Sequence, residues 1–252
     1  MGVSREPTTF TDGVRCEVRS VSSGRPFYTL ALEGATYEGS VALLRDSKVV
    51  AERTLRAEDG GSPRAGRGER LMPAVAECFA EARVGRGEIA QVVCGAGPGS
   101  FTSLRVAGSV AKGLAAGYGV ELFAVSSLVL TASGAQPSLP IGEYLSVLDA
   151  MRGEFFAARI TVRPGGAATQ AGPATLISAD QLANLAMSEP ALRTIGPGQR
   201  IDAHPHARGV APILDSIVKA GPVDLASWEP DYGRLAEAQV RWEAAHGRPL
   251  AT

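Results

Sequence analysis

The sequence of 252 residues contains few of the residues that build metal centres or disulfide frameworks. It has three cysteines and three histidines. The cysteines, Cys16, Cys78 and Cys94, are odd in number and widely spaced, and no Cys-x-x-Cys occurs. We therefore expect neither a disulfide framework nor a zinc site, and the pattern favours a reducing compartment, the cytoplasm.

Strong charge of one sign and long apolar runs are also missing. The chain carries 25 basic and 26 acidic residues, so no basic excess predicts a nucleic-acid-binding face. No stretch approaches the roughly 18 consecutive apolar residues of a membrane span, and the N-terminus lacks the pattern of a signal peptide. A hydrophobic content of 45% is nevertheless enough to build a buried core.

Hydrophobic periodicity predicts an α/β protein with two lobes. Residues 1–26 mix Arg, Glu, Ser, Thr and Gly without periodicity, and we expect a flexible extension there. The first lobe, 27–133, begins with three β-prone runs that predict an antiparallel meander. The expected elements are strands at 27–32, 40–44 and 49–55, a loop at 57–68, a helix at 69–84, a strand at 91–94, a helix at 100–118, a strand at 122–125 and a helix at 127–133.

The second lobe, 137–228, follows a Gly- and Pro-containing break. Its first strands predict a hairpin, and Ser178 with Gln181 forms a capping box that starts a helix. The final segment, 229–252, is expected to form a helix that returns to the first lobe. The expected elements are strands at 144–149 and 154–162, a loop at 163–173, a helix to about 188, a strand at 193–195 and helices at 212–220 and 235–246.

The most informative stretch is GAGPGSFTSLRVAGSVAK. A buried strand leads through Gly97, Pro98 and Gly99 into a helix whose start contains Ser100 and Thr102. Glycine allows close backbone approach, hydroxyl groups can cap the helix, and its free N–H groups can hold an anion. An ordinary strand-to-helix turn explains the same pattern. The stretch lacks the Gly-Lys-Ser/Thr of a Walker A loop and the third glycine of a dinucleotide-binding fingerprint.

An ordered series of motifs resembles the bacterial TsaB (YeaZ) family. GPGSFTSLR, AKGLA and VSSL follow one another between residues 97 and 128, and the family has GPGSFTGLR, AKGLA and VSSL. ERLMP, LDAMRGEFF and PDYGR are similar to its HSERLLP, DARRGEVY and P-x-YLR. The resemblance covers about residues 27–234.

The resemblance implies an actin-like ATPase (ASKHA) fold with two ribonuclease-H-like lobes. It also implies a role in making N6-threonylcarbamoyladenosine at position 37 of tRNA, as a non-catalytic partner of the TsaD transferase. The family is described as glycoprotease-like. The implied partners are a TsaD-like protein in a heterodimer, a TsaE-like ATPase in the larger complex and a second copy when the chain is alone, with tRNA met only indirectly.

The end of the first predicted strand departs from the family pattern. The family has Asp-Thr-Ser-Thr where this chain has Glu33, Gly34, Ala35 and Thr36. An ATPase needs a carboxylate for Mg²⁺ and donors to the phosphates. The changes favour a scaffold without nucleotide chemistry, and we expect no cofactor. Binding of ATP or ADP, or of a metal at Glu33, is the alternative. Glu33 and Thr36, with the glycine turn, are candidates for a vestigial nucleotide site.

Two further clusters admit plain structural explanations. Asp149, Arg152 and Glu154 lie on the predicted hairpin, where they form either a polar site facing the cleft or a turn with local bonds. His204 and His206 lie in a predicted loop and lack the His-x-x-x-His spacing of the catalytic relatives. We expect a solvated surface pair. No Gly-x-Ser-x-Gly elbow supports a peptidase.

The predicted helix at 100–118 is rich in small residues. Small residues at spacings of four, three and four form one stripe, which would let a partner helix approach closely. Packing of the stripe on the protein's own sheet is the alternative. The predicted partner surface comprises Leu104, Gly108, Ala111 and Ala115 of the stripe, with Glu69, Met72, Phe101, Arg105 and Lys112.

The leading hypothesis is therefore a non-catalytic scaffold of a tRNA-modifying complex. One alternative is an active ASKHA-type ATPase or small-molecule kinase, for which the first strand should carry an acidic residue followed by phosphate-binding hydroxyls. The other alternative is a self-associating structural protein outside tRNA modification.

Overall fold

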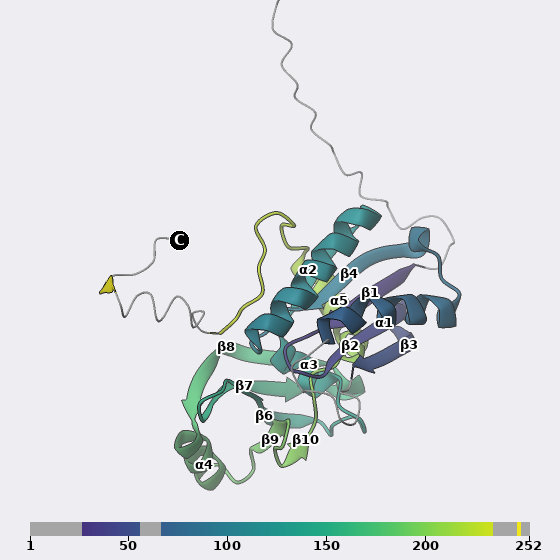
Figure 1. Ribbon diagram of the computed structural model, residues 1–252. Helices are drawn as coiled ribbons and strands as arrows, with labels where there is room; N and C mark the ends of the chain where they lie inside the picture. The colour runs from purple at the N-terminus through teal and green to yellow at the C-terminus, as the bar shows by residue number, and fades with distance from the viewer. Residues whose placement is uncertain (1–26, 56–66, 234–245, 248–252) are drawn as a thin grey trace, which may run out of the picture.

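A computed structural model describes residues 27–55, 67–233 and 246–247. It contains two five-stranded sheets with helices on their faces (Figure 1). No helix in these ranges is long and apolar enough to cross a membrane. Three expected segments lie largely or wholly outside the described residues: the extension at 1–26, the loop at 57–68 and the last helix at 235–246.

The first sheet has the strand order β3-β2-β1-β4-β5. β1, β2 and β3 form the expected antiparallel meander, whereas β4 and β5 are parallel to β1. Parallel neighbours need crossover connections, and α1 and α2 supply them. The bounds are β1 (Tyr28–Glu33), β2 (Gly39–Arg45), β3 (Lys48–Leu55), α1 (Arg67–Ala82), η1 (Arg86–Glu88), β4 (Ile89–Gly95), α2 (Phe101–Tyr118) and β5 (Glu121–Val125).

Both faces of the first sheet are covered, and the alternation along β1 explains how. Leu30 and Leu32 pack into the cluster that contains the buried residues of α1 and α2. Ala31 points the other way and packs into the cluster shared with the second sheet. Because successive strand residues face opposite sides, a nearly continuous apolar strand is what a sheet buried on both faces requires.

The second sheet has the order β10-β9-β6-β7-β8. The predicted hairpin is present as β6 and β7. The capping box is confirmed, because Ser178 Oγ accepts from Gln181 N at 3.2 Å and Gln181 Oε1 accepts from Ser178 N at 2.8 Å. The bounds are β6 (Gly142–Asp149), β7 (Glu154–Val162), η2 (Pro164–Gly166), β8 (Ala168–Ser178), α4 (Ala179–Ser188), β9 (Arg193–Gly196) and β10 (Ile201–Asp202).

The loop predicted at 163–173 is wrong in its second half, because β8 begins at Ala168. The pairing of β8 with β7 shifts register between Ala157 and Arg159. Gly172, with φ of 74°, and the following proline lie opposite this irregularity. A β-bulge accommodates a glycine with positive φ and a residue without an N–H. Loop-like residues therefore lie inside a strand.

Two elements pack on the sheet of the lobe to which they were not assigned. α3 (Ser127–Ser133), expected in the first lobe, packs on β6, β7 and β8, whereas η3 (Ala207–Ile213), expected in the second, contacts β1 to β4. α5 (Leu214–Ala220) contacts β5, and Ala207 N donates to Ser40 Oγ at 2.9 Å. The chain thus returns to the first sheet before residue 229, where the return was expected.

Candidate functional site

The glycine turn between β4 and α2 is held by two other parts of the chain. Gly97 N donates to Ser127 Oγ at 3.1 Å, and Ser127 N donates to Gly97 O at 2.8 Å. Ser100 N donates to Ala35 O at 2.7 Å. Gly97 has φ of 90°, and a Cβ on Gly99 would collide with Ala35, so glycine is required at both positions. With Pro98 buried between them, the turn packs against the end of β1 and the start of α3.

Ser100 and Thr102 differ in what they do at the start of α2. Ser100 takes the N-cap position, but its side chain makes no capping hydrogen bond; its Oγ accepts from Ser103 Oγ at 3.1 Å. Thr102 lies in the first turn and is exposed. The capping role expected of these hydroxyls is therefore not observed. The motif predicted the position of the turn, but not the bonds of its hydroxyl groups.

Glu33 is fully buried beneath the glycine turn. Its carboxylate accepts from Ala35 N at 2.5 Å and from Ser127 Oγ at 3.0 Å, and a Cβ on Gly95 would collide with it. Burial raises the pKa of Glu33 to about 7, although bonds from Ala35, Ser127 and Gly34 act in the opposite direction. Desolvation disfavours the charged form. The carboxyl group is thus enclosed by the fold and does not face solvent.

Thr36 and Asp149, at the start of the β6–β7 turn, bond to nearby backbone groups. Thr36 Oγ1 donates to Glu38 O at 3.0 Å, and Asp149 Oδ1 accepts from Met151 N at 2.7 Å. Arg152 is exposed in the turn with φ of 60°, and Glu154 is half-buried at the start of β7. The bond of Asp149 matches the local-turn explanation of this cluster.

The small-residue stripe of α2 faces into the protein. Leu104, Gly108, Ala111 and Ala115 are buried within the chain itself. A Cβ on Gly108 would lie 3.0 Å from Pro230 Cγ. The prediction that this inner stripe forms the partner surface is therefore wrong, because the protein's own sheet and its C-terminal segment cover it.

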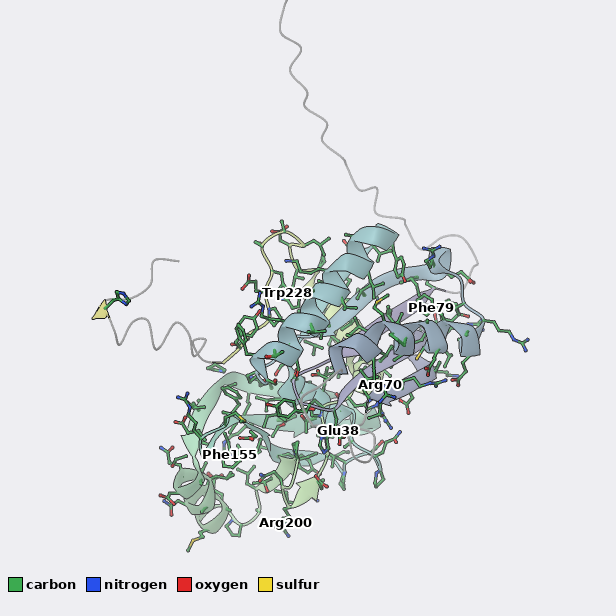
Figure 2. All side chains as sticks on the ribbon, in the orientation of Figure 1. Glu38, Arg70, Phe79, Phe155, Arg200 and Trp228 are labelled. Carbon is green, nitrogen blue, oxygen red and sulfur yellow. The ribbon has the colours of Figure 1, made fainter. Side chains whose placement is uncertain are left out.

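The covering segment runs across α2 from residue 222 to residue 233, and we call it the strap. Val223 N donates to Leu122 O at 2.8 Å and Asp231 N to Ala96 O at 2.7 Å, at its two ends. Lys112 Nζ donates to Trp228 O at 3.0 Å, and Trp228 lies beside α2 (Figure 2). Lys112, predicted at the partner surface, instead holds the strap in place.

The outward surface of α2 carries a second stripe, offset from the first. Its residues are exposed, and a Cβ on Gly113 would have no heavy atom within 4 Å. At the N-terminal end, Phe101 lies against Tyr232 with ring centroids 4.6 Å apart, and Arg105 Cζ lies 5.3 Å from the Phe101 centroid. This outer stripe consists of Arg105, Ser109, Gly113 and Ala116.

α1 extends the outward surface of α2, since the two helices pack side by side (Figure 1). Met72 is 46% exposed and Phe101 38%, and Ala76 is exposed as well. Glu69 lies in the first turn of α1, and its side chain is outside the described part of the chain. Of the predicted surface, Met72, Phe101 and Arg105 face outward.

The two histidines of the His-Pro-His sequence have different environments. His206 is 6% exposed, and its Nε2 lies 3.0 Å from Thr54 Oγ1. Burial, followed by the charge of Arg208, lowers the pKa of His206 to about 3. His204 Nδ1 lies 3.6 Å from Glu38 Oε2. The expected solvated pair is thus wrong for His206. Within the described ranges no group of three or more His, Cys, Asp or Glu is placed to hold a metal.

The inner and outer stripes could not be distinguished from the helix sequence alone. The missing information lies more than 100 residues away, in the Trp228 and Pro230 pair that covers Gly108. Tyr232, which pairs with Phe101, was likewise noted as part of a motif but not as a contact of α2. Bulky apolar residues in a late loop are the sequence signal that could have indicated a cover over small residues.

Comparison with known proteins points to the same family as the sequence motifs. A family model described as TsaD, tRNA N6-adenosine threonylcarbamoyltransferase, matches residues 64–207. The chain is 26% identical to the tRNA threonylcarbamoyladenosine biosynthesis protein TsaB of Bacillus subtilis, over 84% of this chain and 96% of that protein. It is 33% identical to the Escherichia coli TsaB over 50% of this chain and 52% of that protein.

Solved structures agree with this comparison. YeaZ from Pseudomonas aeruginosa superposes with a TM-score of 0.66 at 25% identity, covering 82% of this chain and 99% of that one. The predicted α/β fold is confirmed by this superposition, with two mixed sheets in the described residues. The resemblance that the motifs indicated is confirmed as well.

Proposed function

This chain belongs to the TsaD family, described as tRNA N6-adenosine threonylcarbamoyltransferase, and from that premise we propose that it is a TsaB-type subunit in threonylcarbamoyladenosine synthesis. The observation that carries the proposal is the match to TsaB of B. subtilis over 96% of that protein's length. A match of that extent supports a shared role better than a match to one motif.

Within that role, the protein acts by binding rather than by catalysis. Glu33, which occupies the position of the family's first-strand aspartate, is sealed beneath the glycine turn and bonded to Ser127. Magnesium and phosphate chemistry needs a carboxylate that is accessible to the ligand. This burial supports a subunit that requires no ATP, ADP or metal, and it weighs against the kinase alternative.

The partner is a TsaD-like protein, and the outward surface of α1 and α2 is the proposed binding surface. Met72, Phe101 and Arg105 are exposed there beside small residues. Exposed aromatic and arginine side chains are typical centres of protein interfaces, and small residues such as Gly113 let a helix approach closely. Self-association through the same surface explains a homodimer of the isolated chain, since a two-fold interface uses one patch twice.

Further parts of the proposal follow from the family. A TsaE-like ATPase joins the larger complex, tRNA is met through the partner, and the setting is the cytoplasm. The charge balance of 25 basic to 26 acidic residues supports indirect contact with RNA, because phosphate binding depends on a local excess of Lys and Arg.

Titration of the chain with its cognate TsaD-like protein in a calorimeter tests this proposal. We expect a one-to-one complex, and we expect Gly113→Leu to weaken it by at least about tenfold. Gly87→Leu is the matched control, because Gly87 also has open space around a Cβ but lies in η1. Undiminished binding of Gly113→Leu would place the interface elsewhere.

The same variants and partner protein also test the two alternative functions, the self-associating structural protein and the kinase or ATPase. No binding of the TsaD-like protein by the wild type, together with a stable self-associated state, would favour the structural alternative. ATP hydrolysis by the chain alone that disappears in Glu33→Gln would favour the kinase or ATPase alternative.

A further inference from the structure

Three side chains form a row where the strap meets the start of α2. Arg105 Cζ lies 5.3 Å from the centroid of the Phe101 ring, and that ring lies 4.6 Å from the ring of Tyr232. Phe101 is 38% exposed, Arg105 is exposed and Tyr232 is half-buried. We call these three residues the aromatic–arginine row. It lies at one end of the outward surface proposed for the partner.

The strap holds the Tyr232 end of the row in place. Asp231 N donates to Ala96 O at 2.7 Å, and Gly233 N donates to Asp231 Oδ1 at 2.8 Å, so the backbone is bonded on both sides of Tyr232. A Cβ on Gly97 would collide with Asp231 O, because the strap packs directly on the glycine turn. The ring pair is therefore ordered before a partner arrives, and an ordered side chain loses less entropy on binding.

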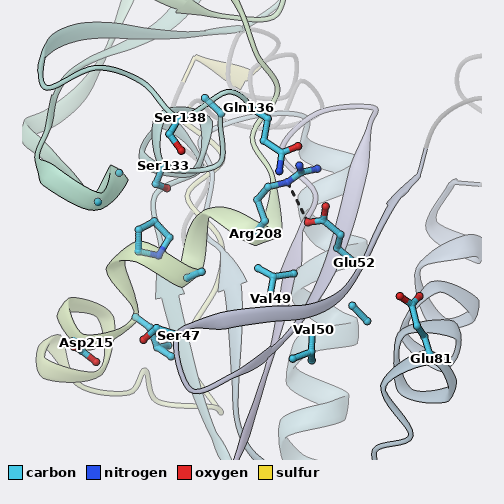
Figure 3. A pocket seen from close by; sticks show the side chains of 17 residues that line it. Ser47, Val49, Val50, Glu52, Glu81, Ser133, Gln136, Ser138, Arg208 and Asp215 are labelled. Carbon is cyan, nitrogen blue, oxygen red and sulfur yellow. Dashed lines mark ion pairs between the residues drawn. The ribbon is translucent and has the colours of Figure 1, made fainter.

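Two other arginines of the described residues direct their donors to acceptors inside the chain. Arg208 lines a groove of about 710 Å³ beside β3, and its Nε lies 3.2 Å from Glu52 Oε2 (Figure 3). Arg193 lies over the ring of Tyr144, with its Cζ 4.6 Å from the centroid, and its Nη2 donates to the hydroxyl of the same tyrosine. Both guanidinium groups thus have a partner within the protein.

Arg105 differs from both. Within the described part of the chain its side chain contacts the Phe101 ring, and neither a carboxylate nor another acceptor pairs with it. Contact with a ring face attracts the cation but supplies no oxygen to the N–H donors. The guanidinium is therefore held at the surface with donors to spare for an acceptor. An acceptor with two oxygens suits it best, since it can form two parallel hydrogen bonds.

The charges around the row favour a carboxylate over a chain of phosphates. Burial and then Glu229 raise the pKa of Tyr232, whereas Arg105 lowers it, so a negative charge acts beside the positive one. Glu229 is exposed and would repel a polyanion, which brings several negative charges at once. Ser109 and Gly113, which continue the outer stripe, add no positive charge. A single acidic side chain meets less repulsion there.

We propose that Arg105 binds the carboxylate of an Asp or Glu side chain of the TsaD-like partner, and that Tyr232 is a positioning residue that supports Phe101 beside it. This inference rests on the proposed function, because it names the chemistry of one contact on the surface assigned there. The end of the strap thereby becomes part of the partner surface, more than 100 residues from α2 in the sequence.

Calorimetric titration of the TsaD-like protein with arginine variants tests the contact. Arg105→Ala should bind at least about tenfold more weakly than the wild type. Arg105→Lys should bind with intermediate affinity, because an ammonium group keeps the charge and loses the two-bond geometry. Arg200→Ala is the matched control, since Arg200 is exposed on the second lobe (Figure 2), and it should bind as the wild type does. Added salt should weaken the wild type more than Arg105→Ala.

Two tyrosine variants test the positioning role. Tyr232→Phe keeps the ring against Phe101 and should bind as tightly as the wild type. Tyr232→Leu removes the ring pair and should bind at least about threefold more weakly. Unfolding in urea shows whether both variants are folded at the titration temperature. Equal binding by the two folded variants would contradict the role of the ring.

A double-mutant cycle identifies the acceptor. Each exposed Asp and Glu of the partner is replaced by Ala and titrated with the wild type and with Arg105→Ala. One replacement should weaken binding to the wild type and have little further effect in Arg105→Ala, because both changes remove the same bond. Additive effects for every replacement would overturn the carboxylate contact.

The outcomes separate this inference from the function beneath it. Tight binding by both the wild type and Arg105→Ala would overturn the inference and leave the proposed function intact. No binding by the wild type would overturn both. Unchanged partner binding by Arg105→Ala, with weaker binding of tRNA by the assembled complex, would assign Arg105 to a phosphate and also overturn the inference.

Discussion

The two stripes of α2 contain similar residues and have opposite surroundings. The inner stripe is covered by Trp228 and Pro230 of the strap, whereas Gly113 in the outer stripe has open space around it. Small residues indicate that something comes close to a helix, but they do not say from which side. Among the described residues, the inner side is completed by the chain itself, and the outer side is open to a partner.

The largest effect is expected from the carboxyl group of Glu33, which is buried beneath the glycine turn. The folded-state pKa of Glu33, about 7, is raised above the ordinary value of 4.5 by burial. Folding therefore favours the protonated form, and the stability it contributes is complete below about pH 4.5 and is lost as the pH rises through about 7. We expect this loss to be about 3 kcal/mol.

Urea unfolding at pH 4.5 and at pH 8, with wild type and Glu33→Gln, measures this loss. The glutamine variant should lack it, so the two proteins should differ in pH dependence by about that amount. Cys94, whose pKa is raised by burial and by the nearby Glu33, stays neutral in this range. Parallel pH profiles for the two proteins would contradict the burial of a titrating carboxyl group.

The second-largest effect distinguishes the two stripes by what a leucine in each does to the stability of the fold. Gly108→Leu forces a side chain against Pro230 and Trp228, and we expect it to destabilise the fold by about 2 kcal/mol. Gly113→Leu, on the same helix, should instead leave stability unchanged or raise it by up to about 1 kcal/mol, because leucine favours a helix over glycine. Thermal and urea unfolding of both variants measure the difference, and equal destabilisation would mean that the outer stripe is also packed.

The smallest effect concerns the strap. Lys112→Met keeps the length of the side chain and removes its bond to Trp228 O, so we expect a loss of about 1 kcal/mol. Exchange of the Asp231 amide, which bonds to Ala96 O, should quicken in parallel. Lys48→Met, at the exposed start of β3, is the control, and an equal response in the control would show that Lys112 does not secure the strap.

Local patterns predicted much of the fold. The meander, the glycine turn, the β6–β7 hairpin and the Ser178–Gln181 capping box depend on neighbouring residues, and they lie where periodicity and turn residues placed them. β8 was missed because Gly172 and Pro173 lie opposite a bulge, and a bulge depends on the partner strand rather than on the sequence of the strand itself.

The site was predicted less well, because its properties depend on distant contacts. The sequence identified Glu33 as a departure from the family pattern, but its enclosure depends on Ser127, which is 94 residues away. The burial of His206 depends on Thr54 of β3. In each case the residue type was informative, and the surroundings that decide its role came from another part of the chain.

The exchange of elements between the lobes sets an order for folding during synthesis. The face of the first sheet that carries Ala31 and Phe123 packs with Ala207, Val210 and Ile213, so a nascent chain ending at residue 133 lacks that cover. The growing polypeptide must carry an apolar surface until η3 leaves the ribosome. The first lobe therefore lacks the cover of one of its faces until η3 has been synthesised, and during this interval the exposed apolar surface is open to aggregation.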